Sequence, residues 1–205
     1  MAWVVTPEQF LNLEQVKKLR ALAQSKAEEA RRSGRWHGIR DYMMLELALG
    51  SGLRASELAS LQVGDIILDP ANPTVVVRRG KGGKMRIVKV GDALIQHLRE
   101  YLKYREAAGR GNSPWLLPGQ RGKWTRHGVG RVFKLLARQA GLPGRFSIHS
   151  LRHTFATMLL KVSKSLRLVQ KALGHSSPVT TAVYADVIDT DALKAANQLY
   201  EDIAS

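Results

Sequence analysis

Two stretches decide the fold of this chain: His149-Ser-Leu-Arg152-His-Thr-Phe-Ala and, further along, Leu-Gly-His175-Ser-Ser-Pro-Val-Thr-Thr-Ala-Val-Tyr184. His149 and Arg152 are three residues apart, so on a helix their side chains project from the same face. An imidazole beside a guanidinium can donate hydrogen bonds to two nonbridging oxygens of one phosphate. Such a pair also occurs on ordinary charged helices, so its neighbours decide its meaning. Cations grouped near one tyrosine predict an enzyme that attacks a phosphate with a phenol.

The charge of the chain is strongly positive. Its 205 residues include 32 Lys and Arg against 17 Asp and Glu, a net charge of +15. No Asp or Glu occurs from residue 107 to residue 185, whereas thirteen Lys and Arg do. Cations without acidic partners predict a polyanionic ligand, and we expect nucleic acid; a basic surface without a ligand is the alternative.

Composition also excludes several classes of protein. The chain has no cysteine, which excludes disulfides and thiolate metal sites. Its longest mostly apolar stretch, residues 42–50, is too short to cross a bilayer and contains Glu46. The first residues lack the pattern of a signal peptide. We therefore expect a cytoplasmic, nucleoid-associated protein that does not bind membranes.

Hydrophobic periodicity predicts a mainly α-helical α+β fold with a small antiparallel sheet of three strands. The first helix has two possible starts, Thr6-Pro-Glu-Gln9 and Asn12-Leu-Glu-Gln15. Further helices are expected over 35–49, where Gly50 ends the helix, and over 54–61, 92–108, 125–140, 147–161 and 165–173. The strands are expected at 65–68, 74–79 and 85–90, and residues 109–122 as a loop. Past Gly174, a helix stop, we expect a short helix that delivers Tyr184 and a final helix over 190–202.

Arg54 lies in Gly50-Ser-Gly-Leu-Arg54-Ala-Ser-Glu57. The glycines allow a tight turn that places Arg54 in the first turn of a helix, where Glu57 can hold its guanidinium in one rotamer. The alternative is an ordinary surface ion pair, which contributes little to stability.

Lys81 lies at the tip of a predicted hairpin, in Arg78-Arg79-Gly-Lys81-Gly-Gly-Lys84-Met-Arg86. A basic finger of this kind can place an ammonium group at a leaving oxygen. The spacing does not match the P-loop, which needs G-x-x-x-x-G-K-[ST] before a helix. We expect the other cations of this run to contact backbone phosphates. We expect the same of the helix after Trp124, which carries Arg126, Arg131, Lys134 and Arg138.

Two further residues need their context. Tyr184 is one of five tyrosines, and most tyrosines are packing residues; its place behind His175 distinguishes it. His153, next to Arg152, is expected to pack inward with a structural role.

Five motifs occur in one order: Gly-Leu-Arg54-x-Ser-Glu57-Leu, Gly-Lys81-Gly-x-Lys, His149-x-Leu-Arg152-His-Thr-Phe-Ala, Leu-Gly-His175-Ser-Ser and Thr-Thr-x-x-Tyr184. Together they resemble the tyrosine recombinase family of phage integrases and Xer-type resolvases, from about Asn12 to the C-terminus. The resemblance implies the catalytic-domain fold of that family and a site-specific recombinase that cuts and rejoins DNA without metal, ATP or another cofactor.

The same resemblance implies a role for each motif residue. Tyr184 is the nucleophile, which forms a 3′-phosphotyrosyl bond and releases a 5′-hydroxyl. Arg54 and Arg152 clamp the nonbridging oxygens, and His175 completes this set of donors. Lys81 gives a proton to the departing 5′-oxygen. His149 assists proton transfer at the tyrosine, and Glu57 is the supporting acid.

The chain also departs from the family pattern. Family members usually carry a separate helical domain that clamps DNA, the core-binding domain, and this sequence has no room for it. We expect residues 1–205 to form a single catalytic domain, either excised or naturally short. Residues 190–205 resemble a segment that docks on a neighbouring subunit, and we expect dimers or tetramers to assemble on a DNA recombination site. Two alternatives stay open: a type IB topoisomerase, and a DNA-binding accessory protein that has lost catalysis.

Overall fold

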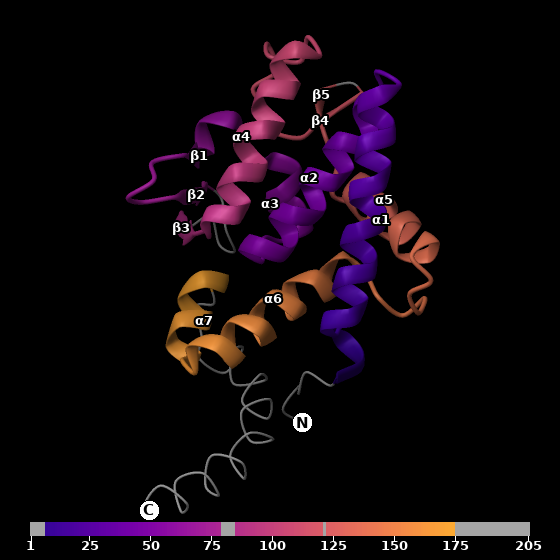
Figure 1. The fold of residues 1–205 in the computed structure, drawn as a ribbon. Coiled ribbons are helices and arrows are strands. Elements are labelled where there is room, and N and C mark those ends of the chain that lie inside the picture. The colour runs from indigo at the N-terminus through magenta and orange to yellow at the C-terminus, as the bar shows by residue number, and fades with distance from the viewer. Residues whose placement is uncertain (1–6, 79–84, 121, 175–205) are drawn as a thin grey trace, which may run out of the picture.

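The computed structural model describes residues 7–78, 85–120 and 122–174 (Figure 1). The helices predicted to deliver Tyr184 and to cover 190–202, as well as the hairpin tip with Lys81, lie outside these residues. None of the described helices is long and apolar enough to cross a membrane.

The N-terminal helix resolves the two possible starts in favour of the second. α1 (Leu13–Arg32) begins after Asn12, whose Oδ1 accepts a hydrogen bond from Gln15 N at 2.8 Å. Gln15 Oε1 in turn accepts from Asn12 N at 3.0 Å, which completes a capping box. The first candidate, Pro7–Gln9, forms a single 3₁₀ turn.

The helical body follows the predicted order. α1 packs along α2 (Trp36–Ser51), and the short α3 (Ala55–Ser60) comes directly after α2. α4 (Asp92–Ala107) and α5 (Arg126–Gln139) complete the body around one buried core. The prediction that α2 ends at Gly50 is wrong, because the helix continues to Ser51 and Gly52 forms its left-handed cap.

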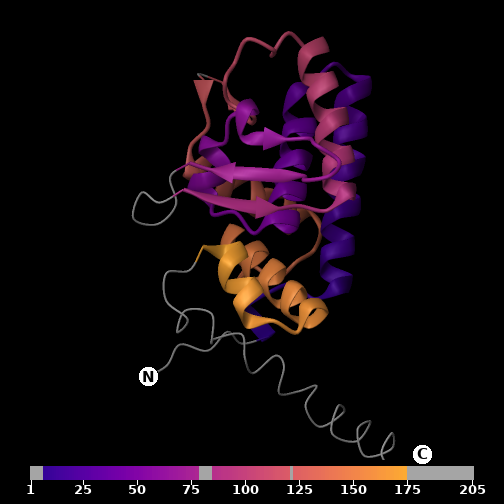
Figure 2. The same ribbon diagram turned by 90° about the vertical axis from the view of Figure 1, so that its left-hand side faces the viewer.

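The predicted antiparallel sheet is confirmed, with shorter strands than expected. β1 (Ile66–Ile67), β2 (Thr74–Val77) and β3 (Arg86–Lys89) lie in that order on the outside of the helical body (Figure 2). In the register, Val75 faces Val88 and Val77 faces Arg86. Val75, Val77 and Val88 are buried. Arg86 lies two residues before Val88 on the same strand, so its side chain is on the same, inner face of the sheet.

A second, two-stranded sheet occurs where a loop was expected. β4 (Pro118–Gly119) pairs with β5 (Gly122–Lys123). Strands of two residues are too short to show alternation, so the sequence pattern could not predict them. Directly after β5, Trp124 is buried, with Arg40 Cζ 4.0 Å from its ring centroid.

The last described helices, α6 (Ile148–Ser163) and α7 (Leu166–Leu173), form the orange and yellow layer below the sheet in Figure 1. They share a small apolar core of Ala156, Leu160, Val169 and Leu173. α6 also packs against α2. The predicted helix stop at Gly174 is confirmed, because Gly174 has φ 65° in the left-handed region.

Candidate active site and nucleic-acid interface

Arg54 stands at the junction of α2 and α3. Gly52, with φ 60°, ends α2, and its N–H donates to Ala48 O at 3.1 Å. A Cβ at Gly52 would lie 2.3 Å from Phe155 Cδ1 on α6, so any other residue at this turn would have to displace Phe155. Arg54 caps α3 with extended backbone, one position earlier than the first helical turn expected for it.

Glu57 holds Arg54 from inside the protein. Its Oε2 accepts from Arg54 N at 2.7 Å, and its Oε1 accepts from Arg54 Nη1 at 2.9 Å. The Glu57 side chain is 4% exposed and that of Arg54 23%. The expected contact is therefore present, and it is a largely buried ion pair and not an ordinary surface pair.

A second arginine shares the same carboxylate. Arg86 donates from Nη1 to Glu57 Oε1 at 2.6 Å and from Nη2 to Glu57 Oε2 at 2.8 Å. Burial raises the pKa of Glu57, but the hydrogen bonds from Arg86 and Arg54 outweigh burial and lower the pKa to about 2. Glu57 is therefore an anion at any physiological pH.

Arg152 joins this region to the end of α7. It is buried, and it donates from Nη1 to Gly52 O at 2.7 Å and from Nη2 to Leu173 O at 2.8 Å. Gly52 lies two residues before Arg54, and Leu173 lies two residues before His175. One buried guanidinium thus ties together the backbone that presents two of the predicted site residues.

The two histidines of α6 sit among these cations. Burial lowers the pKa of His149, and the charges of Arg152 and Arg54 lower it further. Burial also lowers the pKa of His153 to about 4, with added effects from His149 and Arg152. His153 is partly buried. A neutral imidazole can accept a proton, which a permanent cation cannot.

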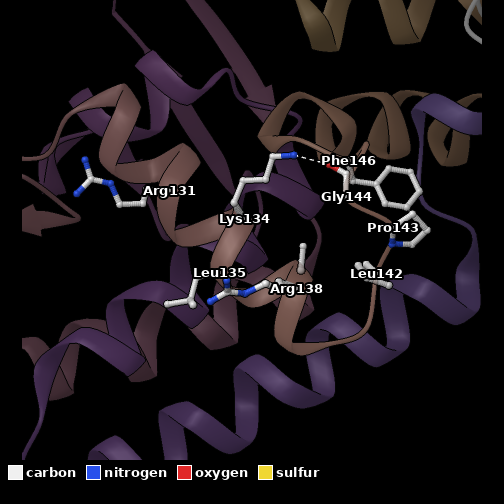
Figure 3. A pocket seen from close by; sticks show the side chains of 9 residues that line it. Arg131, Lys134, Leu135, Arg138, Leu142, Pro143, Gly144 and Phe146 are labelled. Carbon is white, nitrogen blue, oxygen red and sulfur yellow. Dashed lines mark hydrogen bonds between the residues drawn. The ribbon is translucent and has the colours of Figure 1, made fainter.

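The basic side chains of α5 extend from this centre. Arg126, His127 and Lys134 line a pocket of about 380 Å³ together with Ala55 and His149 at the starts of α3 and α6. Lys134 also borders a neighbouring pocket of about 470 Å³ with Arg131 and Arg138 (Figure 3). In this view Lys134 Nζ donates to Gly144 O, at 2.6 Å. The structure thus places His149 beside cations of α5 in one pocket, and close enough to Arg54 for the charge of Arg54 to act on its imidazole.

The remaining predicted residues divide into two groups. Outside the described residues lie Arg79, Lys81, Lys84, His175 and Tyr184. Arg78 is described; its Nε donates to Asp65 Oδ1, while 61% of its side chain stays exposed.

The expectation that Arg86 contacts a backbone phosphate needs correction. Its side chain is 11% exposed, and both terminal nitrogens donate to Glu57. The basic run around Lys81 suggested a surface residue. Arg86, however, lies two and four residues before Val88 and Val90, which are both buried, and this spacing already indicated the inner face of the sheet. Sequence reasoning also missed the dependence of the Arg54 turn on Phe155, for which no local pattern exists.

Comparison with known proteins agrees with this arrangement. The sequence profile described as phage integrase family matches residues 9–190. A tyrosine recombinase XerD from Bradyrhizobium diazoefficiens is 40% identical over 179 residues, covering 83% of this chain and 55% of that protein. The chain spans about half the length of the curated relatives it matches.

Solved structures show the same fold. A XerA recombinase matches with a TM-score of 0.75 and 28% identity, over 92% of this chain and 64% of that one. A XerH site-specific recombinase, solved as a post-cleavage complex with a palindromic difH substrate, matches with a TM-score of 0.73 and 25% identity, over 98% and 54% of the two chains. From its sequence profile, its relatives and its fold, this chain belongs to the phage integrase family of tyrosine recombinases.

Proposed function

We propose that this chain is the catalytic part of a site-specific DNA recombinase that cuts and rejoins strands through a 3′-phosphotyrosyl intermediate. The convergence of Arg54, His149 and Arg152, with Glu57 holding Arg54, is the observation that carries the proposal. Guanidinium groups fixed in advance can neutralise the charge that develops on a pentacoordinate phosphate without reorganising during the reaction.

The chemical step balances as a transesterification. The Tyr184 oxygen attacks the phosphorus, the bond from phosphorus to the 5′-oxygen breaks, and Lys81 supplies the proton that the 5′-oxygen takes. Arg54, Arg152 and His175 bind the nonbridging oxygens, and His149 accepts the phenol proton. The lowered pKa of His149 supports this last role, because the imidazole is then neutral before the reaction. The phosphotyrosyl bond conserves the energy of the broken ester, so rejoining needs no ATP, and these side chains need no metal ion.

Covalent trapping tests this function. The chain is mixed in EDTA with nicked duplexes tiled across the DNA that flanks its gene, denatured, and examined for a protein–DNA band. We expect a band that Tyr184→Phe abolishes. Binding without a band on any duplex would favour a non-catalytic accessory protein, and relaxation of supercoiled plasmid without sequence preference would favour a topoisomerase.

We further propose that α5 contacts DNA phosphates beyond the scissile one. Arg126 and Lys134 line the pocket that contains His149, and Arg131, Lys134 and Arg138 line the neighbouring pocket. The Arg131→Gln, Arg138→Gln double variant should reduce the slope of log K against log salt by about one to two. The control removes two exposed cations elsewhere, Arg32 on α1 and Lys103 on α4. An equal change in both variants would refute a specific contact.

Assembly is the least direct part of the proposal. We propose that residues 1–205 act as one catalytic domain in the cytoplasm, on nucleoid DNA, and that residues 190–205 dock on a neighbouring subunit in a dimer or tetramer. The XerH relative, solved on its recombination substrate, supports DNA as the partner. A chain truncated after Asp189 should lose assembly on DNA while keeping its monomer fold; unchanged assembly would contradict docking.

A further inference from the structure

We propose that Arg86 is a positioning residue of the active site, which acts through Glu57 to hold Arg54 ready for a phosphate. The inference rests on the proposed recombinase function. It assigns Arg86 to the interior of the site and not to the DNA-contacting surface.

The geometry of the Arg86–Glu57 pair is that of a planar fork. Arg86 Nη1 donates to Glu57 Oε1 at 2.6 Å, and Arg86 Nη2 donates to Glu57 Oε2 at 2.8 Å. The two side chains are 11% and 4% exposed, so water screens this pair little. A bidentate pair between buried groups fixes the plane of the carboxylate as well as its position.

Because the carboxylate of Glu57 is already fixed by Arg86, Arg54 needs few of its own hydrogen-bond donors to stay in place. Within the described residues, Arg54 donates from its side chain only through Nη1, to Glu57 Oε1. No hydrogen bond among the described residues occupies its Nε and Nη2, which can therefore serve the oxygens of a phosphate. If Glu57 lacked Arg86, the same carboxylate could rotate and form a full fork with Arg54, which would take those donors away.

The charge balance leads to the same conclusion. Arg54 and Glu57 alone would cancel, which would weaken the attraction of the site for a phosphate. Adding Arg86 leaves one net positive charge on the three groups, so Glu57 can orient Arg54 without neutralising it. A buried carboxylate also needs such partners to stay ionised.

Arg86 touches the other half of the site as well. A Cβ at Gly174 would lie 2.4 Å from Arg86 Cδ, so the stem of Arg86 packs against the residue that ends α7. The neighbouring Leu173 O accepts from Arg152 at 2.8 Å. Arg86 therefore lies between the Arg54 turn and the backbone held by Arg152, and its replacement should disturb both arginines without removing a DNA contact.

A double-mutant cycle tests this role. On a duplex that gives a Tyr184-dependent adduct with the wild type, we measure the rate of adduct formation at saturating DNA and, separately, the Kd for DNA. Arg86→Met should slow the adduct about 10- to 100-fold and change Kd less than about threefold. In a Glu57→Gln background, Arg86→Met should slow it less than about threefold further, because both changes disrupt one pathway.

Two controls make the result interpretable. Arg20→Met removes the arginine of another two-point pair, between α1 and Glu46 of α2, and it should leave the rate at saturating DNA unchanged. Arg86→Lys keeps the charge without the fork, so it should leave the affinity for DNA at the wild-type value and restore the rate only partly. This variant also replaces Arg86→Met in the cycle if the latter fails to fold.

The outcomes separate this inference from the proposed function. A wild-type adduct whose rate Arg86→Met leaves unchanged would overturn the role of Arg86 alone. If Arg86→Met and Glu57→Gln each slowed adduct formation and their effects multiplied, while the affinity for DNA fell and its salt dependence became shallower, the positioning role of Arg86 would be overturned in favour of a direct phosphate contact. Absence of a wild-type adduct on every duplex would overturn the recombinase function and this role with it.

Discussion

Acidification should destabilise this fold through Glu57, and the effect should disappear in Glu57→Gln. The Glu57 carboxyl has a pKa of about 2 in the folded chain against an ordinary value of 4.5. Between these values the unfolded chain binds a proton that the folded chain does not. The stabilisation from Glu57 is therefore complete above pH 4.5 and is lost as the pH falls toward 2.

The size of this effect follows from the same two values. One pH unit of difference corresponds to about 1.4 kcal/mol, so the interval from 4.5 to about 2 gives a stabilisation on the order of 3 kcal/mol at neutral pH. At pH 3 roughly 1 kcal/mol of it remains. The Glu57 side chain is 4% exposed, so solvent screening reduces these figures little.

Urea unfolding followed by circular dichroism at pH 7, 5, 4 and 3 measures the effect. We expect the stability gap between wild type and Glu57→Gln to be largest at pH 7 and 5, and to shrink by about 2 kcal/mol by pH 3. Glu100→Gln, a change at an exposed position on α4, is the control for loss of a carboxylate. A gap that stays constant from pH 7 to pH 3 would refute the argument that Glu57 is held ionised by its two arginines.

Three further variants probe neighbouring features. Gly52→Ala should lower the unfolding free energy by at least about 2 kcal/mol more than Gly109→Ala, because both glycines have left-handed φ but only Gly52 faces a side chain, Phe155; equal losses in urea unfolding would contradict the close contact. Arg152→Lys should abolish the DNA adduct and lower the unfolding free energy by about 1–3 kcal/mol. The control is Arg105→Lys, which changes another buried arginine that donates to backbone carbonyls; it should also lower the unfolding free energy but keep the adduct. His153, with a pKa of about 4 against an ordinary 6.5, should titrate near 4 by NMR, and a titration near 6.5 would contradict its burial. The stability of the chain should fall from pH 6.5 to 4, because only the unfolded chain gains the proton in that range. His153→Gln should remove this pH dependence.

Local sequence patterns predicted the helices well, and the reasons are visible at their ends. The capping residues of α1 and the left-handed Gly174 after α7 are features of neighbouring residues, which a sequence displays directly. The end of α2 was misplaced because two glycines compete. Phe155, a residue of another helix, leaves little space for a side chain at Gly52. A contact between distant residues of this kind gives no local sequence pattern.

The sequence motifs selected residues that the structure brings close together, but they did not predict the contacts between them. The motif order identified Arg54, His149 and Arg152, which the structure brings together. The pair of Arg86 with Glu57 joins residues 29 positions apart, and the basic residues around Arg86 suggested a surface position. The two-residue spacing to buried Val88 favoured the inner face, and the register, which sets Arg86 opposite Val77, agrees with it.

The bridge made by Arg152 also bears on the order in which the proposed phosphate clamp can assemble during synthesis. Its two acceptors, Gly52 O and Leu173 O, leave the ribosome far apart in time, and domains tend to fold as their residues emerge. A nascent chain that already contains Arg54, Glu57 and Arg86 still lacks the group that fixes the Arg54 turn. The proposed phosphate clamp therefore gains this contact only after the residues of α6 and α7 have been made.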